Sequence, residues 1–241
     1  MSILPHAIQH PFATALRFLG EHLLPGSCLL CGVDCQAALF CSACLADLPA
    51  HDGPQCPQCA EPDSHGNVCS DCRKNSPHYD QVIAHFRYEF PVDRIIHALK
   101  YGHQLAIARW LGEALLTHPA IDGHDCIIAM PLHPERIRER GFNQSIEIAR
   151  TISRTTKQPL LLDILKRSRP TVPQTRLSPK ERQSNVRGAF ECSEDLTGRS
   201  ILLIDDVMTT GASLGECARI LKLHGARRVS VAVAARAVKH D

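Results

Sequence analysis

The sequence has few aromatic residues and no long apolar run. Only 5% of its 241 residues are Phe, Trp or Tyr. No uninterrupted apolar stretch reaches the roughly 18 residues that a membrane-spanning helix needs. Charged residues make up 22% and hydrophobic residues 44% of the chain, close to the averages of globular proteins. We therefore expect a chain that folds around a core, with no membrane span and no extensive disorder.

A secretory signal is also missing. The first 25 residues lack a basic N-terminal region, contain three prolines, and interrupt their apolar residues with Arg17 and Glu21. We therefore expect a cytoplasmic protein. The remaining apolar residues recur at helical spacing, which predicts a short helical segment within residues 1–27 that packs on the rest of the protein. Binding to a membrane surface is the alternative.

The net charge is small, but the sum of +2 conceals a division of the chain. Residues 1–130 carry 7 Lys and Arg against 13 Asp and Glu, whereas residues 131–241 carry 20 against 12. Within the second part, residues 131–190 hold 13 basic and 5 acidic side chains. This stretch favours an anionic partner, either a polyanion or a phosphorylated small molecule. A solvated basic surface is the alternative.

Cysteine, in contrast, is abundant and clustered. Eight of the 12 cysteines form four CxxC pairs, arranged as two copies of C-x2-C-x9-C-x2-C. Two CxxC turns can close a tetrahedron of thiolates around zinc, so the pattern predicts two structural zinc sites that supply the folding energy of residues 28–75. The expected ligand sets are Cys28, Cys31, Cys41 and Cys44, and Cys56, Cys59, Cys69 and Cys72. Interleaved pairing of the turns and a disulfide framework are the alternatives. Because the segment is acidic, we expect a scaffold or a protein-docking module more than a DNA contact.

From residue 78 onward, apolar stretches alternate with amphipathic ones, which predicts a parallel-sheet α/β domain over 78–241. We expect strands at 81–88, 125–130, 160–165, 201–204 and 228–235. Helices are expected at 91–100, 104–117 and 143–157, and from the 209–213 loop to about residue 224. Residues 166–188 are basic, contain no aromatic residue, and are expected to form a long loop.

The end of the 201–204 strand carries the strongest functional signal. Asp205 and Asp206 follow the strand, and a loop of small residues comes next, namely Thr209, Thr210, Gly211, Ala212 and Ser213. Small residues at a helix N-terminus bind anions through backbone amides, beyond the carboxyl ends of the strands. The two carboxylates suit sugar hydroxyls or Mg2+. A phosphorylated sugar satisfies both parts of the motif.

The run ILLIDDVMTTGAS at 201–213 resembles the signature with which type I phosphoribosyltransferases bind phosphoribosyl pyrophosphate (PRPP). The resemblance implies that Asp205 and Asp206 bind the ribose 2′ and 3′ hydroxyls as catalytic residues. It implies that residues 209–213 hold the 5′-phosphate and that Mg2+ accompanies the diphosphate.

Other segments are similar to the ComF family of competence and DNA-utilisation proteins, which includes GntX-like members. They are the CxxC pairs, ALKYGHQLAIARWLG at 98–112, PLHPERIRERGFNQS at 131–145 and NVRGAF at 185–190. The resemblance implies a double zinc ribbon joined to a type I phosphoribosyltransferase-like domain. It also implies a role in natural competence, at the stage of single-stranded DNA, with DNA-uptake proteins as partners.

By the same resemblance, residues 131–136 stand at the position of the pyrophosphate loop, and Gln174 lies in a flexible hood over the site. Candidates for contacts with diphosphate or nucleic acid are Lys100, Arg136, Arg138, Arg140, Arg176 and Arg182. The alternative is that these arginines are solvated and that Phe142 is a core residue.

Three kinds of function therefore remain open. As an enzyme, the protein would transfer a phosphoribosyl group from PRPP to an unidentified acceptor, and a nucleotide-salvage phosphoribosyltransferase is one version of this. As a binding protein, it would hold DNA phosphates in a salt-sensitive way, because few aromatic residues are available to stack on bases. The third possibility is a non-catalytic assembly factor that docks through its zinc ribbon.

Overall fold

The computed structural model describes residues 26–36, 38–168 and 186–238. The chain divides into two compact units, Met1–Leu48 and Pro49–Asp241. The first unit contains the first cysteine tetrad and the short helix α2 (Ser42–Ala46), where the Cys41 sulfur accepts a hydrogen bond from the Cys44 amide. Most of the helical segment expected within residues 1–27 lies outside the described residues. Among those described, no helix is long and apolar enough to cross a membrane.

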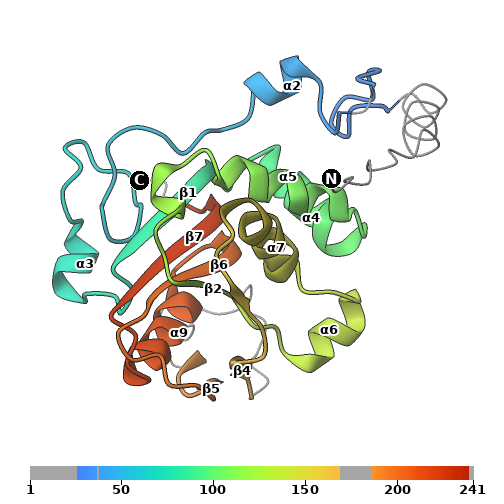
Figure 1. Ribbon diagram of the computed structural model, residues 1–241. Coiled ribbons are helices and arrows are strands. Elements are labelled where there is room, and N and C mark those ends of the chain that lie inside the picture. The colour runs from blue at the N-terminus through green and yellow to red at the C-terminus, as the bar shows by residue number, and fades with distance from the viewer. Residues whose placement is uncertain (1–25, 37, 169–185, 239–241) are drawn as a thin grey trace, which may run out of the picture. The chain divides into compact units, whose positions relative to one another are not determined.

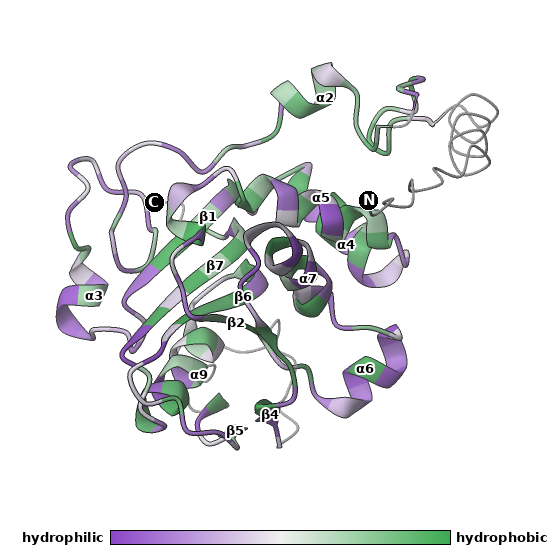
Figure 2. Ribbon diagram, in the orientation of Figure 1, coloured by the Kyte–Doolittle hydropathy of each residue, from purple (hydrophilic) through white to green (hydrophobic). Residues whose placement is uncertain are grey.

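The second unit is built around a parallel five-stranded sheet with the strand order β1-β7-β6-β2-β3 (Figure 1). Its strands are β1 (Gln81–Arg87), β2 (Cys126–Ala129), β3 (Leu160–Leu161), β6 (Ser200–Met208) and β7 (Arg228–Arg236). Apolar residues dominate β2, β6 and β7 (Figure 2), as is typical of parallel strands covered on both faces. The predicted parallel α/β fold is confirmed.

Helices cover both faces of this sheet. Helices α4 (Val92–Tyr101), α5 (Leu105–Leu115) and α7 (Gln144–Thr156) lie on one side, and α9 (Ala212–Leu223) lies on the other (Figure 1). Since the strands are parallel, their carboxyl ends meet at one edge, and the loops that follow them converge there. Two further short helices are α3 (Ser70–Lys74) and the 3-10 turn η1 (Pro119–Ile121).

Two expected strands have different boundaries. The strand expected at 201–204 continues to Met208, because β6 pairs with β7 as far as Met208 and Arg236. Asp205 and Asp206 therefore belong to the strand instead of following it. The single strand expected at 160–165 is two strands: β3 joins the main sheet, and β4 (Leu165–Arg167) pairs antiparallel with β5 (Phe190–Cys192).

Residues 131–136 do not form a loop throughout, because helix α6 (Pro134–Arg140) begins within them. The His133 ring accepts a hydrogen bond from the Glu135 amide, and Pro134 has no amide hydrogen to leave unpaired. Gly141, with φ of 80°, ends the helix in the left-handed conformation. In the long basic stretch, Lys166 and Arg167 belong to β4, while Gln174, Arg176 and Arg182 lie outside the described residues.

The second cysteine tetrad shares its compact unit with the sheet. Cys56, Cys59 and Cys72 belong to one buried cluster with Tyr79 and with apolar residues of β6, β7 and α9. The boundary between the compact units thus falls between the two tetrads.

The contact between α5 and α7 depends on a glycine. A Cβ atom at Gly112 would lie 2.7 Å from Cβ of Thr151 and 3.0 Å from the Ile148 carbonyl oxygen. We expect Gly112→Ala to lower the free energy of unfolding by about 1–3 kcal/mol, because the helices have to move apart. The control is Gly215→Ala in α9, where the nearest atom is 3.9 Å away and alanine should stabilise the helix by about 0.5–1 kcal/mol. Urea unfolding measures both, and equal effects would contradict the close approach.

Candidate functional site

The site is centred on the two aspartates near the end of β6. Asp206 is buried, with 4% of its surface exposed, and Asp205 is half-buried. The Ser145 hydroxyl donates to Oδ1 of Asp205 at 2.8 Å. Nε2 of Gln144 donates to Oδ1 of Asp206 at 3.2 Å, and the Lys100 ammonium forms an ion pair with Oδ2 of Asp206. The C-terminus of α4 and the N-terminus of α7 therefore meet at the acid pair.

The two carboxyl groups differ in charge near neutral pH. Burial and the neighbouring Asp206 carboxylate raise the pKa of Asp205 to about 7. Burial also opposes ionisation of Asp206, but the Lys100 ammonium outweighs it and lowers the pKa of Asp206. Burial disfavours the charged form of Lys100 as well, and the Asp206 carboxylate prevails, so that the pKa of Lys100 is raised. Asp206 and Lys100 thus form a charged pair, beside an Asp205 that titrates near physiological pH.

The loop after β6 has the features of an anion site. Gly211, with φ of 75°, caps the N-terminus of α9, and Thr209 and Thr210 are exposed. A Cβ atom at Gly211 would lie 2.6 Å from Cε of Met208 and 2.9 Å from the Tyr79 hydroxyl, so only glycine fits without displacement. The first amides of a helix are left without intrahelical partners, and with the helix dipole they favour an anion.

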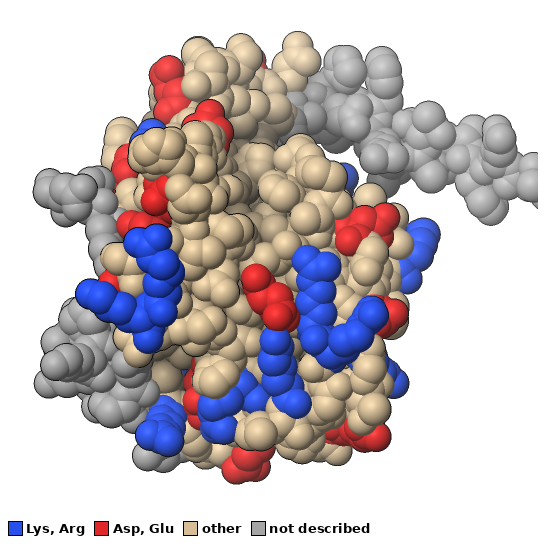
Figure 3. All heavy atoms as spheres, turned by 90° about the vertical axis from the view of Figure 1, so that its left-hand side faces the viewer, with Lys and Arg blue, Asp and Glu red and all other residues tan. Residues whose placement is uncertain are grey.

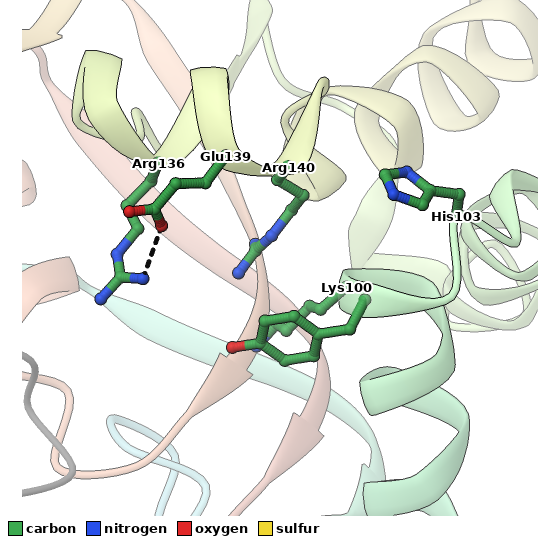
Figure 4. A pocket seen from close by; sticks show the side chains of 6 residues that line it. Lys100, His103, Arg136, Glu139 and Arg140 are labelled. Atoms are coloured by element: carbon green, nitrogen blue, oxygen red, sulfur yellow. Dashed lines mark hydrogen bonds and ion pairs between the residues drawn. The ribbon is translucent and has the colours of Figure 1, made fainter.

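A small pocket of about 100 Å³ adjoins Lys100, which also pairs with Asp206. Figure 4 shows side chains of α6 reaching toward the end of α4 in this pocket. The Arg140 guanidinium lies 5.4 Å from the centre of the Tyr101 ring and donates to Oε1 of Gln144. Arg136 pairs with Glu139 at 2.8 Å, as the dashed line marks. The structure thus brings Lys100, Arg136 and Arg140 together, while Arg138 is exposed on α6 and does not line this pocket.

The cysteines form two tetrads, each from one sequential unit. Within each tetrad the four Sγ atoms lie within 4.8 Å of one another. The Sγ atoms of Cys31 and Cys41 are 3.8 Å apart, and those of Cys59 and Cys69 are 3.7 Å apart. Tetrahedral zinc with Zn–S bonds of about 2.3 Å requires S···S distances of about 3.8 Å. Burial raises the pKa of Cys59 to about 12 and the Cys56 thiolate adds to the shift, so a cation is needed for all four sulfurs to ionise. The residues fit structural Zn2+.

Two family models match the chain. A double zinc ribbon domain matches residues 19–73, and a phosphoribosyl transferase domain matches residues 142–240. The DNA utilization protein YhgH of Escherichia coli O157:H7 is 31% identical over an alignment of 218 residues that covers 86% of this chain and 96% of that protein. The chain belongs to the ComF family of competence and DNA-utilisation proteins. The predicted family, with its double zinc ribbon and phosphoribosyltransferase-type domain, is confirmed.

Two further relatives of this ComF family member are named as competence proteins. Competence protein F of Haemophilus influenzae is 31% identical over 210 residues, covering 82% of this chain and 90% of that protein. Competence protein ComFC of Bacillus subtilis is 29% identical over 206 residues, covering 75% of this chain and 77% of that protein.

Sequence reasoning named Lys100 as a candidate but missed Gln144 and Ser145, the other two side chains that contact the acid pair of this ComF protein. Gln144 and Ser145 come directly after Asn143, whose side chain caps α7 by accepting from the Ser145 amide. A capping residue before an amphipathic stretch was a visible signal for the start of a helix. It did not show that this helix would begin beside β6, about 60 residues away in sequence.

Metal analysis tests the tetrads. Purified protein should contain about two zinc ions per chain, because each set of four thiolates closes one tetrahedral site. Cys28→Ser and Cys56→Ser should each remove about one ion. Plasma emission spectrometry, with a thiol assay under denaturing conditions, measures zinc and free cysteine together. Metal-free protein with oxidised cysteines would contradict the zinc sites.

Proposed function

We propose that this ComF protein binds PRPP together with Mg2+, and that it does so in the utilisation of external DNA at the single-stranded stage. The observation that carries the proposal is the place of the acid pair. The pair lies on the strand that leads into the 209–213 loop, which favours a phosphate, and Asp206 pairs with Lys100, which lines a pocket together with Arg140. PRPP carries a phosphate, two ribose hydroxyls and a diphosphate, which would meet the loop, the acid pair and this pocket in turn.

The acid pair suits a magnesium ion that arrives with its ligand. Mg2+ is usually held by one or two carboxylates together with substrate phosphates. Asp206 is paired with Lys100, which leaves Asp205 as the carboxylate of the pair that Lys100 does not neutralise directly. A cation beside Asp205 would also favour its ionised form, which burial now disfavours.

The same arrangement supports transfer of the phosphoribosyl group. The bond between the anomeric carbon and diphosphate breaks, the diphosphate leaves with the electron pair, and an acceptor forms a bond to that carbon. Negative charge develops on the leaving diphosphate, where Lys100 and Arg140 would stabilise it. Nucleotide salvage is the competing activity, and turnover of PRPP with free purine or pyrimidine bases separates it from a role with DNA.

The proposed DNA contact uses the basic region that includes α6 and α7. Arg138 is exposed on α6, and Arg154 is exposed on α7. Lys and Arg side chains are also present on the side that lies at the left of Figure 1, mainly over the lower half of the view in Figure 3. The relatives named for DNA utilization and competence support a nucleic-acid partner over a free base.

The acid pair and the phosphate loop can be tested separately by calorimetry with PRPP plus Mg2+ and with inorganic phosphate. Asp205→Asn should weaken PRPP binding roughly tenfold to hundredfold, since a hydrogen bond to a charged group is lost. It should leave the affinity for inorganic phosphate unchanged. Asp206→Asn is less informative, because it strands the Lys100 ammonium.

The matched variant is Gly211→Val, which should abolish binding of both ligands by crowding the loop. Wild-type protein that binds no PRPP in the presence of Mg2+ would overturn the proposal. So would equal PRPP affinity in wild type and Asp205→Asn.

Binding of single-stranded DNA should depend steeply on salt, because phosphate contacts release counterions. Arg138→Ala should weaken binding of all sequences alike and lower the slope of log K against log salt by about 1. The control is Arg109→Ala, an exposed arginine of α5 in an i,i+4 pair with Glu113, which should change neither. Fluorescence anisotropy with oligonucleotides of different sequence measures both. Base-specific binding that ignores salt would contradict an electrostatic contact.

A further inference from the structure

Arg236, at the end of β7, is a buried charged residue that the proposed function does not use. Only 5% of its surface is exposed. Its Nε donates to the carbonyl oxygen of Cys59 at 3.0 Å, and its Nη2 pairs with Oε2 of Glu61 at 2.7 Å. Its Nη1 donates to the carbonyl oxygen of Thr209 at 2.6 Å, with a longer contact of 3.4 Å to that of Met208. One guanidinium thus joins the second zinc ribbon to the loop after β6.

Tyr79 makes a second contact between the same two parts. Its side chain is buried in the cluster that contains Cys56, Cys59 and Cys72. Its hydroxyl oxygen lies only 2.9 Å from the position that a Cβ atom at residue 211 would occupy. The ribbon side of the unit therefore also shapes the space around Gly211.

The two parts line an open pocket of about 1130 Å³. Thr209, Thr210 and Gly211 line it from the loop, and Cys59 and Glu61 line it from the ribbon. A pocket for a drug-sized ligand is about 300–1000 Å³, so this space exceeds what a single phosphate group needs.

We propose that the second zinc ribbon forms one wall of the phosphate site and that Arg236 is the positioning residue that holds the 209–213 loop ready for a phosphate monoester. The phosphate ligand rests on the proposed function, whereas the coupling of ribbon and loop rests on the contacts of Arg236. A loop that binds an anion must turn its amides toward the ligand and its carbonyl oxygens away from it. Arg236 binds the Thr209 carbonyl from the ribbon side and thereby keeps that oxygen from facing the anion. The Met208 carbonyl accepts a hydrogen bond from the Ala237 amide, with Arg236 as a longer second contact.

The conservative variant Arg236→Lys tests the coupling, because lysine keeps the charge but lacks the planar fork that reaches several oxygens at once. We expect phosphate binding at least tenfold weaker by calorimetry and faster amide hydrogen exchange over residues 209–213, with zinc content unchanged. The matched control is Lys222→Met. It removes a different ion pair, between Nζ of Lys222 in α9 and Oδ1 of Asp80 at 2.8 Å, without touching the loop. This control should leave exchange over 209–213 as in wild type.

A second pair of variants tests the zinc ribbon. Cys56→Ser should speed exchange over residues 209–213, whereas Cys28→Ser, in the other compact unit, should lose the same amount of zinc without this effect. Hydrogen exchange needs no ligand, so the two proposals can fail separately. Wild-type protein that binds neither phosphate nor PRPP overturns the proposed function. Unchanged exchange in Arg236→Lys overturns the coupling, even where PRPP binds.

Discussion

Asp206 is almost fully buried near the end of the central strand β6, and a buried carboxylate needs a counter-charge. The positions of several neighbouring elements depend on this requirement. Lys100 provides the counter-charge from the last turn of α4, so α4 must end at this edge of the sheet. Gln144 provides a donor from the first turn of α7. Asn143 sets that start, since its side chain caps α7 and also donates to the carbonyl oxygen of Met130, directly after β2. Strands β2 and β6 and helices α4 and α7 thus share one network.

Such a network is better understood as a positioning device than as a source of stability. Replacing a buried ion pair by apolar groups is often neutral or stabilising, because both charges lose their hydration. The Lys100–Asp206 ion pair makes the pKa values of the adjacent Asp205 and Asp206 carboxyl groups differ. Asp206 is held ionised by Lys100, while burial and the Asp206 charge raise the pKa of Asp205 to about 7. Two identical residues therefore differ in charge state, one held ionised and the other with a pKa close to neutral pH.

The sequence predicted the order of the candidate site's parts where the signal was local, and it failed where the arrangement depends on residues distant in the chain. The acid pair and the 209–213 loop occupy contiguous residues, and so their order was visible. The end of β6 was placed too early because apolar character stops at Ile204, while pairing with β7 continues to Met208. Helix α6 was missed although Pro134 and Gly141 mark its ends, because its position was assigned as a loop by resemblance. Arg236 had no local signal, since its partners Cys59 and Glu61 come from a distant part of the chain.

The two zinc ribbons show how identical ligand spacing can support different structural roles. In the second tetrad three of the four cysteines are buried, and they share a cluster with the sheet and α9. In the first tetrad only Cys28 is buried, and the tetrad belongs to the other compact unit. Zinc chemistry is the same in both, because four thiolates impose the same tetrahedron. The residues packed around the ligands of each zinc site determine which part of the structure that site stabilises. At the second site, Arg236 binds the carbonyl oxygen of the ligand Cys59 and also that of Thr209, in the loop after β6.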